Sequence, residues 1–158
     1  MDPGLSAAAD RVFSEVLSEF AFLFGDPVTA KELPRLEGRA YLARLPFHGS
    51  VTGHVALAVP EGLALQIAAN TLGIEAADPE VSRKAEDALK EVASVMGGHL
   101  AASLAGAAGA VELSPPHLVA LEPAEWERLS ADPETQCYAV NEQPVLLRVE
   151  LKRGGATT

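Results

Sequence analysis

The chain has 158 residues, 48% of them hydrophobic and only 5% aromatic, which fits one soluble domain with a core of Ala, Leu and Val. A formal net charge of −10 argues against nucleic acid or an anionic membrane surface as partner. No apolar run reaches the roughly 18 residues that span a bilayer, and no signal peptide is visible. Cys137 is the only cysteine, so an intrachain disulfide is excluded and a cytoplasmic location is expected.

The first half of the chain predicts a helix, a β-hairpin and a second helix. Apolar residues recur at helical spacing over residues 7–24, and Gly25-Asp26-Pro27 is typical of a helix end. Residues 39–47 and 51–59 predict two strands joined at His48-Gly49-Ser50. A helix over residues 62–72 follows.

The second half begins with the longest predicted helix, over residues 81–104. Its apolar positions recur about every 3.6 residues, at Ala85, Leu89, Val92, Met96, Leu100 and Ser103. Gly97-Gly98 interrupts this pattern, which predicts either a close backbone approach or a kink. Strand pieces are expected at residues 111–113, 118–121, 136–140 and 145–152, with a short helical turn over 123–129. That turn carries Trp126, either as a lid packed on the core or as an exposed anchor for a partner.

These elements predict an α+β fold in which an antiparallel sheet is covered on one side by two long helices. Glu15-Val-Leu-Ser18 in the first long helix mirrors Glu91-Val-Ala-Ser94 in the second, so an internal pseudo-two-fold repeat is expected. We expect one domain over residues 1–158, with mobile tails at residues 1–5 and 154–158.

A polar stripe follows one face of the longest helix. Asp87, Glu91 and Ser94 are spaced i, i+4 and i+7, and Lys84 and Gly98 fall within the same arc. Taken alone, this pattern is typical of any solvated amphipathic helix, and a generic soluble domain remains one interpretation.

The chain resembles the CheC/CheX/FliY family of chemotaxis phosphatases, in particular its single-domain CheX branch. That family is marked by Asp or Ser, three residues, Glu, two residues, Asn, and a proline some twenty residues later. Here Asp87, Glu91 and Ser94 are followed by Pro115-Pro116. Further similarity lies in residues 51–60, 65–73, 96–104 and 113–116, so that the resemblance spans roughly residues 35 to 152.

The resemblance implies hydrolysis of the aspartyl phosphate of a phosphorylated CheY-like receiver domain in two-component signalling. It assigns Glu91 to the receiver's active-site lysine and Ser94 to the position of the water-orienting Asn, with Lys84, Asp87 and Gly98 contacting the partner. No cofactor of the chain's own is implied, because the receiver supplies the Mg²⁺. Relatives of the CheX type form homodimers through their sheets, which implies a homodimer here.

Serine in the asparagine position departs from the family pattern. Serine offers one hydroxyl on a shorter side chain, and a water misplaced by about 1 Å costs on the order of 10²-fold in rate. The sequence therefore predicts a weak phosphatase, and a non-catalytic receiver-binding or scaffold protein is the alternative. Glu15 and Ser18 are interpreted as a structural relic, since Arg11 replaces the expected Asp or Ser. The four histidines lack the spacing of metal ligands.

Overall fold

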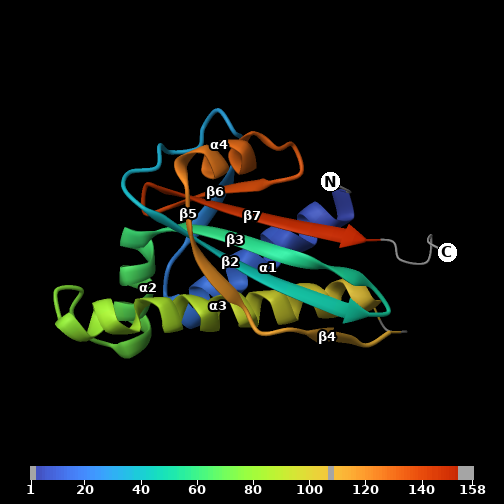
Figure 1. The fold of residues 1–158 in the computed structure, drawn as a ribbon, viewed down its shortest axis with the longest axis horizontal. Helices are drawn as coiled ribbons and strands as arrows, with labels where there is room; N and C mark the ends of the chain where they lie inside the picture. The colour runs from blue at the N-terminus through green and yellow to red at the C-terminus, as the bar shows by residue number, and fades with distance from the viewer. Residues whose placement is uncertain (1–2, 107–108, 153–158) are drawn as a thin grey trace.

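The computed structural model describes residues 3–106 and 109–152 and is built around one antiparallel sheet (Figure 1). The strands are β1 (Gly25–Val28), β2 (Ala40–Gly49), β3 (Thr52–Pro60), β4 (Val111–Leu113), β5 (His117–Leu121), β6 (Gln136–Val140) and β7 (Gln143–Lys152). Their order is β1-β6-β7-β3-β2-β4, and β5 also pairs with β2. The helices are α1 (Pro3–Ala21), α2 (Glu61–Leu72), α3 (Pro79–Ala105) and α4 (Pro123–Ala131).

The sheet is centred on the predicted hairpin of β2 and β3. Leu45 pairs with Val55, and Ala43 pairs with Leu57. Side chains alternate along a strand, so these four residues face the same side and join the main core. Gly49 ends the hairpin's first strand with φ +139°, where an added Cβ would lie 2.3 Å from the Ala110 carbonyl oxygen. Only glycine fits this turn.

Helices α1, α2 and α3 cover one face of the sheet. Phe13 and Leu17 of α1 and Leu89 and Met96 of α3 are buried against Leu147 and neighbouring strand residues. In Figure 1, α3 runs along the lower side of the sheet and α2 lies beside its N-terminal part. The α+β class and the antiparallel sheet are therefore confirmed, whereas the internal two-fold repeat stays a prediction.

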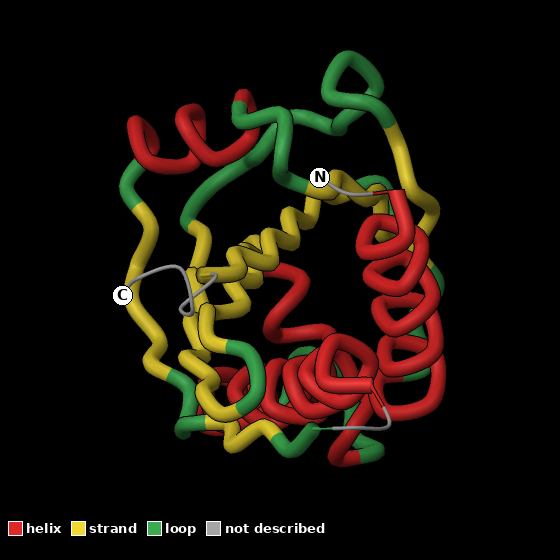
Figure 2. The backbone as a smooth tube through the Cα atoms, turned by 90° about the vertical axis from the view of Figure 1, so that its right-hand side faces the viewer, coloured by secondary structure: helices red, strands yellow, loops and turns green. Residues whose placement is uncertain are grey.

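The opposite face of the sheet carries a smaller core under α4. Trp126 packs there with Cys137, Leu146 and Leu121, and its side chain is buried. Figure 2 shows the strands lying between α4 and the long helices. Of the two interpretations of Trp126, the lid packed on the core is the correct one.

The end of α1 differs from its prediction. The helix stops at Ala21 instead of Phe24, because Phe22 adopts a left-handed conformation with φ 55°. Gly25-Asp26-Pro27, interpreted as punctuation, lies within the edge strand β1, which pairs with β6. Residues 3–5, expected in a mobile tail, belong to α1, whereas residues 1–2 and 154–158 lie outside the described residues.

Helix α3 also corrects one expected core position. Ser103 is exposed, although its spacing matched the apolar series. The helix continues through Gly97-Gly98, and only Gly97 faces the sheet, where an added Cβ would meet Leu45 and Leu113 at 3.4 Å. The predicted close backbone approach is therefore not found: an added Cβ at Gly97 would make ordinary van der Waals contacts with side chains, and one at Gly98 would meet no described neighbour within 4 Å. None of the helices in the described part of the chain combines the length and apolarity needed to cross a bilayer.

Candidate functional site

The buried side of α3 fixes which residues this helix presents to solvent. Asp78 caps its start by accepting a hydrogen bond from the Glu80 backbone N–H at 2.9 Å, and Pro79 occupies the first helical position. Leu89, Met96 and Leu100 then anchor the helix in the core. Because opposite faces of a helix cannot both be buried against one sheet, the polar stripe points outward.

The structure brings all five predicted site residues onto this outward face. Lys84, Asp87 and Glu91 are exposed, and Ser94 and Gly98 are half-buried. Among the described residues, no hydrogen bond or ion pair occupies the Glu91 carboxylate or the Ser94 hydroxyl. Both groups are therefore available to an external partner, with no internal interaction to break.

Glu91 also lies on the edge of a groove that the sequence did not predict. The groove has a volume of about 340 Å³ and lies between the ends of α1 and α2 and the middle of α3. Its lining is mainly apolar and includes two acidic side chains: Glu19, Phe20, Phe22, Thr71, Leu72, Ala88, Glu91, Val92 and Val95. Ser94 and Asp87 are not among the lining residues, so the polar stripe and the groove share Glu91 as a common border.

Exposed aromatic side chains distinguish this groove from the rest of the surface. Phe20 and Phe22, which line the groove, are 42% and 64% exposed, and Phe24, which does not line it, is 78% exposed. The chain has five phenylalanines in all. The helical pattern placed Phe20 and Phe24 on the buried side of α1, and this expectation is wrong: Phe20 is exposed in the last turn of α1, and Phe24 lies beyond the helix end at Ala21. The signal in the sequence was the concentration of three aromatics within five residues of a chain poor in them.

Three hydrogen bonds from other elements hold α1 in place. At its C-terminal end, beside the groove, the Asn70 side chain of α2 donates a hydrogen bond to the Ala21 carbonyl at 2.8 Å. In the middle of the helix, the Tyr138 hydroxyl donates to Asp10 at 2.6 Å, and the Gln136 amide donates to the same oxygen at 2.9 Å. Burial, followed by the hydrogen bond to Asp10, strongly raises the pKa of Tyr138.

The α1 counterpart of the stripe has a different setting. Glu15 is exposed, but it is not among the residues that line the groove. The Ser18 hydroxyl donates to the Glu15 carbonyl at 3.1 Å and is therefore already engaged within its own helix. Arg11, exposed, stands four residues before Glu15 where α3 has Asp87.

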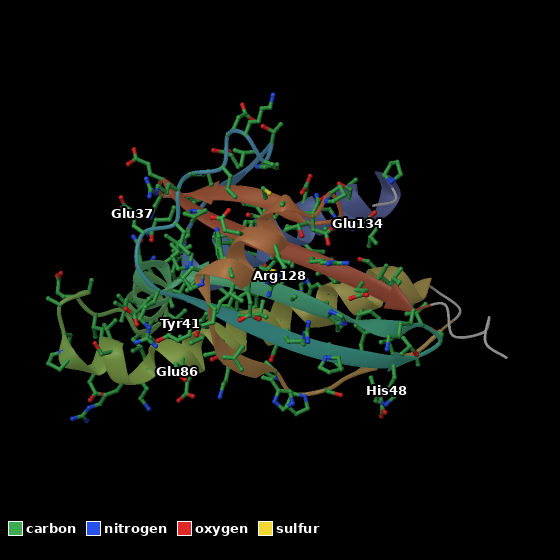
Figure 3. The ribbon with its side chains drawn as sticks, turned by 45° about the horizontal axis from the view of Figure 1, so that its top comes forward. Glu37, Tyr41, His48, Glu86, Arg128 and Glu134 are labelled. Carbon is green, nitrogen blue, oxygen red and sulfur yellow. The ribbon has the colours of Figure 1, made fainter. Side chains whose placement is uncertain are left out.

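Two of the four histidines pair with a glutamate on a neighbouring strand. His48 lies 3.1 Å from Glu112, and His54 lies 3.1 Å from Glu150. Figure 3 shows His48 toward the hairpin end of the sheet, at the other end of β2 from Tyr41. Within residues 3–106 and 109–152, no group of three or more His, Cys, Asp or Glu side chains is arranged to hold a metal ion.

Solved structures with the same fold come from chemotaxis proteins. A CheX from Desulfovibrio desulfuricans has a TM-score of 0.69 at 14% identity, covering 94% of this chain and 99% of its own. A CheX from Vibrio vulnificus gives 0.68 at 17%, covering 94% and 96%. CheX in a CheX–CheY–BeF3–Mg²⁺ complex from Borrelia burgdorferi gives 0.65 at 16%, covering 93% and 97%. The α+β fold is thus that of CheX/CheC-like proteins.

The sequence itself identifies the family. The family model of the chemotaxis phosphatase CheX matches residues 41–139, which include the whole polar stripe of α3. The chain therefore belongs to the CheX family, as the resemblance predicted. Among curated protein sequences, none matches the chain.

Proposed function

We propose that this chain binds the phosphorylated receiver domain of a CheY-like response regulator through α3 and hydrolyses its aspartyl phosphate slowly. The observation that carries the proposal is Glu91, which is exposed and has no partner within residues 3–106 and 109–152, on a helix whose other face is fixed in the core. Membership of the CheX family supports the phosphatase chemistry. The Borrelia burgdorferi relative, solved together with CheY, supports the kind of partner.

Each residue of the stripe has a proposed role. Glu91 pairs with a lysine at the receiver's phosphorylation site, and the Ser94 hydroxyl holds the attacking water. Lys84, Asp87 and Gly98 contact the surrounding receiver surface. Phosphoryl transfer passes through a loose transition state, so positioning the water and stabilising spread charge supply most of the rate. The Mg²⁺ belongs to the receiver, and we propose no cofactor for this chain.

Serine at position 94 limits the expected rate. Its oxygen is closer to the helix backbone than an asparagine amide would be, and the side chain is half-buried. A water held there stands further from the phosphorus atom. This observation also favours a second candidate, in which the chain binds the phosphorylated receiver without hydrolysing it.

The decisive experiment measures decay of receiver phosphate. CheY-type receiver domains of the source organism are phosphorylated with a small-molecule donor and mixed with wild type, Glu91→Ala, Ser94→Asn or Glu15→Ala. We expect weak acceleration by wild type, more by Ser94→Asn, none by Glu91→Ala, and no change for Glu15→Ala relative to wild type. Binding without acceleration by wild type or Ser94→Asn would support the non-catalytic candidate. Activity that survives Glu91→Ala would refute the site.

We further propose a homodimer formed through the sheet, as the family resemblance implies. Strand β1 lies at one edge of the sheet and β4 at the other, next to β5. Exposed strand edges pair readily with another chain. Light scattering after size-exclusion chromatography tests this, and a monomer of 16.5 kDa at micromolar concentration would contradict it.

A further inference from the structure

In the groove beside Glu91, Phe22 has a backbone conformation and a side-chain exposure that folding alone does not explain. Phe22 adopts φ 55° at the C-terminal end of α1, a conformation for which helix ends normally use glycine. Its ring is 64% exposed, so burial of the side chain does not offset the unfavourable backbone conformation. A strained residue that gains little from its own fold is typical of a functional contact.

The lining of the groove indicates the chemistry of what binds there. Phe20, Phe22 and Leu72 are apolar and exposed, and Val92 and Val95 lie on the α3 side. Glu19 and Glu91 add two carboxylates, and no basic residue is among the lining side chains. An apolar surface with two negative charges complements a segment that carries an apolar side chain next to a lysine or arginine.

The border that the groove shares with the polar stripe indicates which partner binds in the groove. Glu91 belongs to both surfaces, so a partner that pairs with Glu91 at its phosphorylation site also meets the mouth of the groove. We propose that the groove lined by Phe20 and Phe22 is a second docking point for the receiver domain and sets which receiver this chain recognises. This inference rests on the proposed function, and it adds a specificity surface to the catalytic stripe.

A docking point of this kind affects receiver binding but not the rate of the hydrolysis step. The aromatic rings of the groove are not part of the Glu91–Ser94 pair that is proposed to act on the phosphoryl group. Their contacts with the receiver should therefore be the same in the ground state and in the transition state. Interactions of that kind raise KM when they are removed and leave kcat unchanged. Aromatic anchors are also the side chains that most often dominate the affinity of an interface.

The experiment compares Phe20→Ala, Phe22→Gly and Phe24→Ala with wild type. The probe is a panel of CheY-type receiver domains from the source organism, each loaded with BeF3⁻ and Mg²⁺, and Kd is measured by calorimetry. Phe22→Gly removes the ring and relaxes the backbone, so its melting temperature should equal or exceed that of wild type. Phe24→Ala is the matched control, because Phe24 is exposed but does not line the groove.

We expect Phe20→Ala and Phe22→Gly to weaken receiver binding by about tenfold each, with kcat for receiver phosphate unchanged, and Phe24→Ala to stay within about twofold. Equal binding by all three variants would overturn the inference while leaving the proposed function intact. No binding of any receiver by wild type would overturn both. Conversion of a dimer to a monomer by Phe22→Gly, with receiver affinity unchanged, would assign the groove to a second copy of this chain and also overturn the inference.

Discussion

Helices α1 and α3 carry the same short pattern of Glu, two residues and Ser, but they present it in different surroundings. On α3 the Glu91 carboxylate borders a groove, and the Ser94 hydroxyl has no partner among the described residues. On α1 the Ser18 hydroxyl donates to the Glu15 carbonyl, and Glu15 is not part of the groove lining. Because both copies satisfy the same helical spacing, only their surroundings distinguish them, and we propose that these surroundings decide which copy acts on a partner.

In the proposed function, the two helices have different roles at the groove. Helix α3 would supply the groups that act on the phosphoryl group, whereas the end of α1 forms a wall of the groove; α1 is held by the hydrogen bond from Asn70 and, further back, by the Asp10–Tyr138 hydrogen bond. If that division is correct, substitutions on α3 change turnover and substitutions that disturb α1 change affinity or stability.

Removing the Glu91 carboxylate of α3 should have the largest effect on kcat/KM. Glu91→Ala should lower kcat/KM for receiver phosphate by about 100-fold, equivalent to about 2.7 kcal/mol, since a charge in the interface loses its partner. Glu15→Ala is the matched control and should change kcat/KM by less than twofold. An equal loss of kcat/KM in the two variants would show that α1 and α3 do not differ in this respect.

Introducing the asparagine of the family pattern should raise turnover on α3 but not on α1. Ser94→Asn should raise kcat on the order of tenfold, because the longer side chain carries a water closer to the phosphorus atom. Ser18→Asn on α1 should leave kcat at the wild-type level. Receiver-phosphate decay under single-turnover conditions measures both. A gain from Ser18→Asn would show that the α1 copy is an active site after all.

Loosening α1 should affect stability more than chemistry. Tyr138→Phe removes a hydrogen bond to the Asp10 carboxylate and should lower the free energy of unfolding by about 1.5 kcal/mol. Tyr41→Phe is the control, because its bond to Glu61 is longer, at 3.3 Å, and Tyr41 is only half-buried, whereas Tyr138 is buried. Urea unfolding measures both changes. A large fall in kcat for folded Tyr138→Phe would mean that α1 takes part in catalysis.

The smallest expected effect is the pH dependence of stability that comes from His54. Burial lowers the pKa of His54 below 6.5, and Arg44 adds to this, while Glu150 opposes it. The folded state then binds a proton less readily than the unfolded state, so stability is greatest above pH 6.5 and declines as the pH falls through that value toward the folded pKa. His54→Gln should flatten urea midpoints between pH 7.5 and 5.5. A wild-type midpoint that rises on acidification would contradict the sign.

Much of the architecture followed from periodicity. The hairpin and α3 were predictable because their apolar residues alternate or recur over nine or more positions and pack on a single core. The outward orientation of Glu91 followed from the same pattern. Trp126, for which two interpretations stood, was settled by the second core under α4, which is formed by residues distant in sequence.

The groove could not be predicted from the sequence because it depends on where α1 ends. Helical spacing extended through Phe24, but the left-handed Phe22 stops the helix and turns the following residues into β1. Phe24 thereby falls outside the helix, whereas Phe20 stays in its last turn and is exposed at the groove. Ser103 was also expected in the core but is exposed, although Leu100 and Leu104 on either side of it pack on the main core.

The position of Trp126 has a practical consequence for future measurements. It is the sole indole of the chain, and it is enclosed on the face of the sheet opposite α1 and α3. Its fluorescence on excitation at long wavelength therefore reports collapse or melting of the layer under α4. The groove lies between α1, α2 and α3 on the other face of the sheet, so we expect a ligand bound there to leave that emission unchanged.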